Sequence, residues 1–214
     1  MVVAIDGPSG VGKSTVARAV AAALGLAYLD TGSYYRATTR VALLAGADPG
    51  DEEAVLDALA AANLTVIDGV LRLAGTDVST DLRSPAVTRS VSIVAAHPLV
   101  RQAVVAMQRS WVEGQAGSAV VEGRDIGTVV FPDADVKIFL TADAAVRAER
   151  RAGDAEVSGA SVEELTAEMR QRDLADSNRV ASPLRAAEDA VTIDTSSLGV
   201  AEVVAMILDL VGAV

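Results

Sequence analysis

The part of this chain that most constrains its fold is a glycine-rich segment near the start. Residues 7–14 read Gly-Pro-Ser-Gly-Val-Gly-Lys-Ser, which is a complete G-x-x-x-x-G-K-S pattern. The apolar run Val2–Ile5 precedes the pattern, and Lys13–Leu24 follows it with Ala, Val and Leu at helical spacing. A loop of this kind binds phosphate where a buried strand delivers it to the start of a helix. The sequence therefore predicts a strand, a phosphate-binding loop and a helix in direct succession.

Each part of this loop has a physical role in holding a nucleoside triphosphate. Glycine lets backbone N–H groups turn toward phosphate oxygens, and the N-terminus of the helix adds partial positive charge. Lys13 is expected to reach the β- and γ-phosphates, and the Ser14 hydroxyl is expected to bind Mg²⁺. The residues expected to surround the phosphates are Gly7, Pro8, Ser9, Gly10, Val11, Gly12, Lys13, Ser14 and Thr15.

The order of apolar runs along the chain predicts an α/β fold. Runs rich in Val, Ile and Leu alternate with helical segments, which is typical of a parallel sheet. The expected strands are Val2–Asp6, Ala27–Leu29, Ala119–Glu122, Val136–Leu140 and Ala190–Asp194. Ligands of such sheets bind beyond the carboxyl ends of the strands. We therefore expect a five-stranded parallel sheet covered by helices, of the P-loop NTPase type, in a single domain over residues 1–214.

Two segments depart from the alternation of strands and helices. Leu64–Ile67 and Val70–Leu73 flank an Asp-Gly pair, which favours a tight hairpin turn. Residues 38–88 contain this hairpin and are expected to form a small inserted subdomain. Residues 150–180 include a break rich in Gly, Ala and Ser between arginine-bearing helices. We expect this second segment to form a mobile lid.

Composition limits the class of protein. The formal net charge of −11 argues against non-specific binding to nucleic acid, which needs an excess of Lys and Arg. The chain has no cysteine, so disulfides, thiolate chemistry and cysteine-based zinc sites are excluded. No apolar stretch approaches the length of a membrane span, and the chain enters its first strand directly. We expect a monomeric cytoplasmic protein that has small-molecule partners and neither a membrane nor a nucleic-acid partner.

Arginines gather near the expected carboxyl ends of strands. Arg36 and Arg124 each follow a predicted strand, and the guanidinium fork binds phosphate oxygens bidentately. Such groups suit phosphoryl transfer, which needs aligned phosphates and neutralised charge. A second set at helical spacing consists of Arg172, Asp173, Asp176 and Arg179. This set fits phosphate binding and exposed i,i+3 and i,i+4 ion pairs equally well, so both interpretations stay open.

Five segments of the chain form one further pattern. They are Ile5–Ser14, Leu29–Gly32 with Tyr35-Arg36, Val94-Ala95 with Val100-Arg101, Glu122–Pro132, and Arg172-Asp173 through Asn178-Arg179. Together they resemble the bacterial cytidylate kinases, which belong to the nucleoside monophosphate kinase group. The resemblance extends over nearly the whole chain, and Gly-Arg-Asp-Ile-Gly-Thr-Val-Val-Phe-Pro is its most specific run. The glycine-rich loop alone is shared with many unrelated proteins.

This resemblance implies a direct, in-line transfer of the ATP γ-phosphoryl group to CMP or dCMP, with Mg²⁺ as the metal. It implies that residues 38–88 lie at the monophosphate site. The residues that it places at the catalytic centre are Lys13, Arg124, Asp125, Arg172 and Arg179. It also places Arg150 or Arg151 near the transferred phosphoryl group, on the side of the bound ATP.

The resemblance further assigns the residues that hold the acceptor nucleotide. Those expected at the acceptor phosphate are Arg36, Arg124 and Arg179, with Tyr35 beside them. Those expected at the edge of cytosine are Ser92, Arg101 and Asp125. Those expected near the sugar are Thr31, Arg172 and Asp176.

The three residues assigned to the base also make chemical sense. Cytosine offers an amino donor, a ring-nitrogen acceptor and a carbonyl acceptor. Asp125 can accept from the amino group, while Ser92 and Arg101 can donate to the other two positions. Uracil carries a carbonyl in place of the amino group, so it would leave a buried carboxylate unpaired. Asp125 is therefore expected to select cytosine over uracil.

Two other functions are compatible with the glycine-rich loop. A kinase for AMP, UMP or shikimate would keep the fold but needs other residues at positions 92, 101 and 125. A nucleotide-dependent switch would usually carry an Asn-Lys-x-Asp string, and the sequence has none. A substrate screen separates these functions, because a kinase transfers phosphate to an acceptor and a switch transfers it to water.

Overall fold

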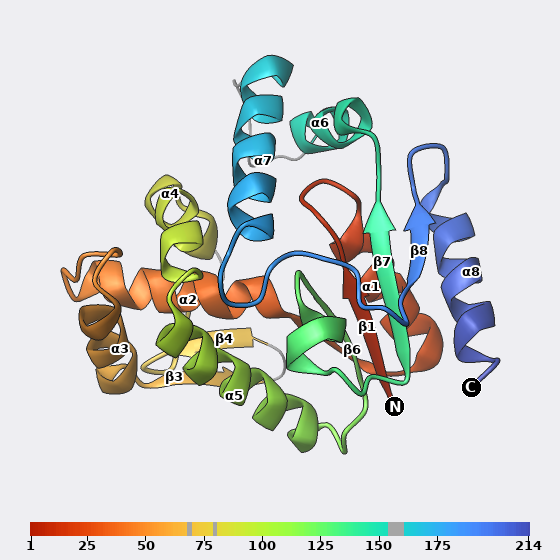
Figure 1. Ribbon diagram of the computed structural model, residues 1–214. Helices are drawn as coiled ribbons and strands as arrows, with labels where there is room; N and C mark the ends of the chain where they lie inside the picture. Colours follow the sequence, from red (N-terminus) through yellow and green to blue (C-terminus); the bar gives the residue numbers. More distant parts are fainter. Residues whose placement is uncertain (68–69, 79–80, 154–160) are drawn as a thin grey trace. The chain divides into compact units, whose positions relative to one another are not determined.

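The computed structural model describes residues 1–67, 70–78, 81–153 and 161–214 (Figure 1). The chain divides into two compact units. The first unit consists of Met1–Leu29 and Gln115–Val214, and the second consists of Asp30–Gly114. The second unit is therefore an insertion in the sequence of the first, and each is described by itself.

The first unit is built on a five-stranded parallel sheet. Its strands are β1 (Val2–Asp6), β2 (Ala27–Asp30), β6 (Ala119–Gly123), β7 (Val136–Thr141) and β8 (Val191–Asp194). The strand order is β2-β6-β1-β7-β8, so the strand before the glycine-rich loop is central. Val3 of β1 lies opposite Val120 on one side and Val136 on the other. The predicted fold class is confirmed, and each strand ends within one residue of its predicted bounds.

Two helices of this unit share a core with the sheet. They are α1 (Lys13–Leu24) and α8 (Val200–Val211), which lie on the same side of the sheet in Figure 1. Val16 and Val20 of α1 and Ile207 of α8 belong to one buried cluster with side chains of β1, β6, β7 and β8. The helix α1 begins and ends at its predicted residues. Gly25 follows it with a φ of 65°, a left-handed conformation that glycine adopts without strain.

A second pair of helices, which pack against each other, follows β7. They are α6 (Ala144–Ala152) and α7 (Val162–Ser177). The Ser161 side chain accepts a hydrogen bond from the Glu164 backbone N–H, and the Glu164 carboxylate accepts one from the Ser161 N–H. This reciprocal cap fixes the start of α7. Residues 154–160 of the predicted lid lie outside the described residues, so the mobility of the segment 150–180 stays a prediction.

One element of the first unit was not predicted. It is η2 (Ile126–Val130), a single turn of π-helix after β6. The segment consists largely of glycine, threonine and valine, which all disfavour helices. Its sequence therefore gives no reason to expect a helical turn. Single π-turns occur frequently at functional sites.

The second unit combines helices with a small antiparallel sheet. Its helices are α2 (Thr31–Leu44), α3 (Glu52–Ala61), η1 (Asp81–Arg83), α4 (Pro85–Val94) and α5 (Pro98–Gly114). Its strands are β3 (Leu64–Ile67), β4 (Val70–Leu73) and β5 (Thr76–Asp77). The hairpin strands are as predicted, while the turn at residues 68–69 lies outside the described residues. Residues 38–88 fall within this unit, and their standing as a separate subdomain stays a prediction.

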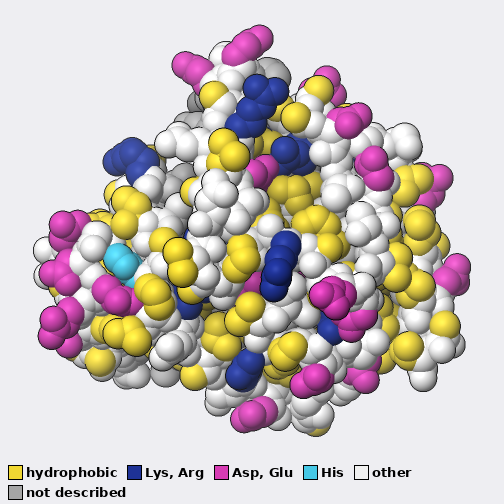
Figure 2. All heavy atoms as spheres, viewed as in Figure 1, with side chains coloured by type: hydrophobic (Ala, Val, Ile, Leu, Met, Phe, Trp, Pro, Cys, Tyr) yellow, Lys and Arg dark blue, Asp and Glu magenta, His cyan; other side chains and the backbone are white. Residues whose placement is uncertain are grey.

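Charged side chains are dispersed over the face of the molecule that Figure 2 draws. Figure 2 shows acidic side chains singly or in small groups on both units, with basic side chains among them. Within the described parts of the chain, no single helix is long and apolar enough to cross a membrane. The helices α4 and α5 reach the required length and composition only as a pair, and that pair is bent by 104°.

Candidate active site

The glycine-rich loop, called the P-loop here (Gly7–Ser14), joins the central strand β1 to α1. Its glycines permit close backbone approach. A Cβ on Gly7, whose φ is 149°, would lie 2.3 Å from the Leu140 carbonyl oxygen. A Cβ on Gly10 would lie 2.8 Å from the Arg147 carbonyl oxygen. No side chain of the described residues caps the start of α1, so its first N–H groups can face phosphate oxygens.

Lys13 carries the positive charge of the P-loop. Its Nζ donates to the Pro8 carbonyl oxygen at 2.6 Å. The pKa of Lys13 is lowered to about 7, first by burial and then by the Arg124 guanidinium, while the Glu122 carboxylate opposes the shift. Cations held this close together repel one another, and a bound polyanion removes that cost. The loop and Lys13 therefore fit a phosphate ligand.

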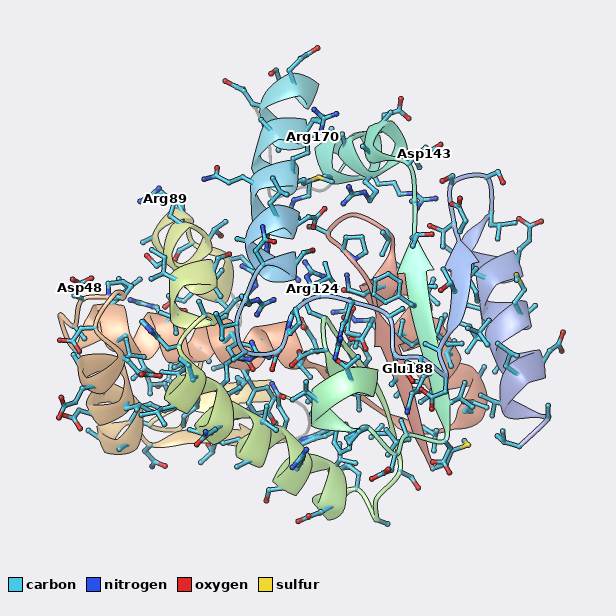
Figure 3. All side chains as sticks on the ribbon, in the orientation of Figure 1. Asp48, Arg89, Arg124, Asp143, Arg170 and Glu188 are labelled. Atoms are coloured by element: carbon cyan, nitrogen blue, oxygen red, sulfur yellow. The ribbon has the colours of Figure 1, made fainter. Side chains whose placement is uncertain are left out.

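Arg124 lies between the P-loop and α7, as Figure 3 shows. Its Nη1 donates to the Gly7 carbonyl oxygen at 2.7 Å, and its Nε donates to an Asp176 carboxylate oxygen at 2.9 Å. Arg179 binds the other Asp176 oxygen at 2.9 Å. Burial alone would raise the pKa of Asp176, but Arg124, Arg179 and Arg172 outweigh it and the pKa is lowered. The structure thus brings four of the predicted site residues together.

This cluster decides one of the alternatives that the sequence left open. The side chains of Arg179 and Asp176 are each only 8% exposed, so they are not a solvated surface pair. Asp176 lies in α7 and Arg179 just beyond its end, and both side chains are buried beside Arg124. Arginine is the residue type that binds phosphate oxygens bidentately, so the cluster has the chemistry of an anion site.

The tip of the P-loop is held by α6 and α7. Asp173 accepts a hydrogen bond from the Ser9 backbone N–H at 3.2 Å, and Arg147 donates to the Ser9 carbonyl oxygen at 3.0 Å. Arg147 and Asp173 also form a direct ion pair. Ser9, expected only as a phosphate ligand, therefore also anchors the loop to both helices.

Arg150 and Arg151 lie in the last turn of α6. Arg150 donates to the Thr195 hydroxyl at 2.9 Å and to the Thr195 carbonyl oxygen at 2.7 Å. The Thr195 hydroxyl in turn donates toward Val11 of the P-loop and Thr141 of β7. These contacts connect Arg150 to the P-loop through the segment after β8. The predicted contact of Arg150 or Arg151 with a phosphoryl group stays a prediction.

Five of the predicted site residues belong to the second unit, and the described geometry is internal to that unit. Arg101 is 3% exposed and donates to the Ala95 carbonyl oxygen at 3.0 Å. Its guanidinium lies 5.0 Å from the centre of the Tyr35 ring, which is a cation–π contact. Thr31 is buried at the start of α2. Arg36 on α2 and Ser92 on α4 are half-buried.

Sequence reasoning missed two buried carboxylates at the ends of neighbouring strands. Asp6 ends β1 and is 4% exposed, while Glu122 is in β6 and is 3% exposed. The Tyr28 hydroxyl donates a short hydrogen bond to Glu122, and the Arg18 guanidinium lies over the Tyr28 ring. A carboxylate that ends an otherwise apolar strand beside a P-loop is the signal that could have identified both residues.

The donor groups also bear on metal binding. No group of three or more His, Asp or Glu side chains that could hold a metal ion occurs among the described residues. The hydroxyl of Ser14, in the first turn of α1, is a hard oxygen ligand of the kind that Mg²⁺ takes alongside phosphate oxygens. The residues present therefore fit a magnesium ion that arrives with a nucleotide.

The sequence matches a family model described as cytidylate kinase over residues 3–213. It is 51% identical to a cytidylate kinase of Mycobacterium avium over 217 residues, which cover 99% of this chain and 95% of the relative. It is 49% identical to a cytidylate kinase of Mycobacterium leprae, with the same two coverages of 99% and 95%. These matches span both units of the chain.

Among solved structures, the chain resembles an uncharacterised protein of Eubacterium ventriosum with a TM-score of 0.55. The likeness covers 100% of this chain and 99% of that one, at 13% sequence identity. At so low an identity the likeness concerns the fold alone.

Proposed function

Because this chain belongs to the cytidylate kinase family, we infer that it transfers the γ-phosphoryl group of ATP to CMP or dCMP. The products are ADP and CDP or dCDP. The observation that carries this conclusion is the 51% identity to a cytidylate kinase along 99% of the chain. A complete P-loop on the central strand of the sheet supports it, because that loop holds the donor phosphates in such kinases.

On the donor side, the P-loop N–H groups and Lys13 bind the ATP phosphates. The Ser14 hydroxyl holds Mg²⁺, which when bound neutralises charge on the β- and γ-phosphates. Lys13 becomes fully charged beside the phosphates, because an adjacent anion raises the pKa that burial and Arg124 now lower. Arg150 or Arg151 adds a further cation near the γ-phosphate.

On the acceptor side, the family resemblance assigns the phosphate of CMP to Arg36, Arg124 and Arg179. Arg172 and Asp176 contact the sugar, as does Thr31. The acceptor is a phosphate oxygen that is already largely ionised near neutral pH, so this transfer needs no strong general base. The site therefore works mainly by aligning two phosphates and neutralising the charge between them.

The base is read by three side chains. Asp125, which is 4% exposed, accepts from the cytosine amino group, while Ser92 and Arg101 donate to the ring nitrogen and the carbonyl oxygen. Burial of Arg101 and its contact with the Tyr35 ring fix the direction of its donors. Selectivity for cytosine follows from the cost of leaving the Asp125 carboxylate unpaired.

The reaction is tested by ADP release from ATP and Mg²⁺ with a panel of acceptors. The panel contains CMP, dCMP, UMP, AMP, GMP, dTMP and shikimate. Strong release with CMP and dCMP alone is expected. ADP release with another acceptor would mean that the protein is a kinase for that acceptor. ADP release at the same rate with and without an acceptor would indicate hydrolysis of ATP.

The reading of the base is tested by Asp125→Ala. We expect the ratio of kcat/KM for CMP to that for UMP to fall by about 100-fold, because the residue that rejects uracil is gone. Asp133→Ala, at an exposed acidic residue of the same strand connection, is the matched control and should keep the ratio. An unchanged ratio in Asp125→Ala would remove Asp125 from the base site.

We further propose that the protein acts as a cytoplasmic monomer. The support is its high net negative charge, which keeps copies of a protein apart in solution. Light scattering coupled to size-exclusion chromatography tests this proposal, with a mass near the 21.8 kDa of one chain expected. A mass of twice that value would contradict it.

A further inference from the structure

A buried carboxylate joins the P-loop strand to the loop after β6. It contacts neither substrate in the proposed reaction. Asp6 is the last residue of β1 and directly precedes Gly7 of the P-loop. One of its oxygens accepts the Ile126 N–H at 2.9 Å, and the other accepts the Gly127 N–H at 2.8 Å. These partners lie 120 and 121 residues away in the sequence. Asp6 is therefore a long-range contact between two loops.

The two N–H groups that Asp6 binds are the first of η2. The opening N–H groups of a helical turn lack partners within that turn and need an outside acceptor. Asp125 precedes η2 but does not cap it with its own side chain. Asp6 supplies the cap instead, so the Asp125 side chain is not used as the cap.

A second contact runs in the opposite direction. The Arg124 guanidinium donates to the Gly7 carbonyl oxygen at 2.7 Å. Asp6 and Gly7 thus hold residues on both sides of Asp125, through the N–H groups of Ile126 and Gly127 and through the side chain of Arg124. The segment Arg124–Phe131, called the β6 loop below, is fastened to the strand that carries the P-loop.

Keeping a charge at position 6 is costly for the fold. Burial raises the pKa of Asp6 to about 6, against the lowering effect of the two backbone hydrogen bonds. Asp125 of the β6 loop also raises this pKa, and Lys13 of α1 lowers it. A neutral side chain would avoid the cost of burial but could not accept two N–H bonds with two oxygens.

We propose that Asp6 is a positioning residue for the acceptor nucleotide, holding Arg124 and Asp125 of the β6 loop in place against the P-loop strand. This inference rests on the proposed function, in which Arg124 binds the acceptor phosphate and Asp125 reads the base. It adds a residue that acts through these two groups and does not itself contact the substrate.

The test is Asp6→Asn, with KM measured separately for CMP and ATP. The amide offers one acceptor oxygen and turns an NH₂ group toward a backbone N–H, so one of the two bonds is lost. We expect KM for CMP to rise about 10-fold or more and the preference for CMP over UMP to narrow, because charge-assisted hydrogen bonds are the strong ones. KM for ATP should stay within about twofold, since the P-loop keeps its glycines and Lys13.

Asp135→Asn is the matched control. Asp135 accepts the Val2 N–H at 2.6 Å, so it makes the same kind of bond to the opposite end of β1. This variant should keep both KM values of the unaltered protein. Equal changes in both KM values for Asp6→Asn, or no change in either, would overturn the inference.

Hydrogen exchange gives a readout that does not depend on activity. The amides of Ile126 and Gly127 should exchange faster in Asp6→Asn than in the unaltered protein, while the amides of α1 keep their rates. Unchanged rates at both amides would also overturn the inference. If the unaltered protein does not use CMP, the proposed function fails, and the exchange rates alone then decide whether Asp6 holds the β6 loop.

A second variant covers the case in which Asp6→Asn does not fold. Asp6→Glu keeps the charge but moves the carboxylate outward by one methylene, so the β6 loop is displaced while the burial of charge is similar. The same split between the two KM values is expected. Identical KM values for Asp6→Glu and the unaltered protein would contradict the role given to Asp6.

Discussion

The P-loop and the β6 loop both lie at the carboxyl ends of strands of one sheet, yet a short sequence pattern marks the structure of only the first. The P-loop follows a complete local pattern and has a local bond, from Lys13 to the Pro8 carbonyl oxygen five residues away. Its tip is also held from a distance, by Asp173 and Arg147. In the β6 loop, Arg124 reaches Gly7 across 117 residues and Asp176 across 52 residues. A short pattern can thus mark one loop of a site, while tertiary contacts hold both loops in place.

The two loops also differ in the groups that surround their glycines. In the P-loop, Gly7 faces the backbone of β7, which cannot move without disturbing the sheet. In the β6 loop, a Cβ on Gly127 would meet only the methylene groups of the Lys137 side chain, at 3.2 Å or more, so a shift of a few tenths of an ångström relieves the contact. Substitutions in the two loops should therefore have effects of different size.

The largest expected effect is that of Gly7→Ala. The new methyl group would lie 2.3 Å from the Leu140 carbonyl oxygen at a φ of 149°, so the sheet must shift. We expect a loss of about 3 kcal/mol or more in the free energy of unfolding, measured by urea denaturation. The matched substitution Gly127→Ala places its methyl group 3.2 Å from Lys137 Cδ and should cost only about 1 kcal/mol. Equal losses would contradict the distinction between the two loops.

A smaller effect is expected for Asp176→Asn, which removes the charge that fastens Arg124 to α7. Asp176 is buried between Arg124 and Arg179, so its substitution weakens the charge-assisted hydrogen bonds that it accepts and should cost about 2 kcal/mol at pH 7. The pKa of Asp176 is lowered in the folded protein, mainly because these cations overcome the effect of burial. Its stabilisation is therefore present above the ordinary pKa of aspartate and is lost as the pH falls through the lowered value.

Urea denaturation of both proteins between pH 7 and pH 3 measures this dependence. The difference in unfolding free energy between Asp176→Asn and the unaltered protein should shrink as the solution becomes acidic. The exposed Asp133→Asn is the control and should show little difference at any pH. A difference that stays constant across the range would mean that packing, rather than charge, explains the loss.

The smallest expected effect concerns the proton on Lys13. Burial lowers the pKa of Lys13 to about 7, so at pH 8 most of the free protein carries a neutral amine. A bound triphosphate favours the charged form, so binding should take up close to one proton per molecule. Calorimetry of a non-hydrolysable ATP analogue in buffers of different ionisation enthalpy measures this uptake. Lys13→Arg keeps its charge at this pH and should take up none, and an equal uptake in both proteins would contradict the assignment.

The parts of the fold that sequence analysis predicted correctly share a physical cause. The helix α1 and the five strands follow from apolar periodicity and from glycines at fixed positions, which act over a few residues. The motif Gly-Arg-Asp marked Arg124 and Asp125 by resemblance, without showing what holds them. The burial of Asp176 and Arg179 could not be derived from their spacing, because i,i+3 pairs have the same pattern on exposed and buried helix faces.

The sequence by itself determined the P-loop, the order of strands and helices and the family to which the chain belongs, because these depend on patterns within short stretches. The tertiary structure alone decided that Asp6 caps η2 and that Arg124 joins the P-loop to α7. It also decided that Asp173 and Arg147 hold the tip of the P-loop. These contacts join residues that are distant in the chain, and only the packing of strands and helices brings such residues within hydrogen-bond distance.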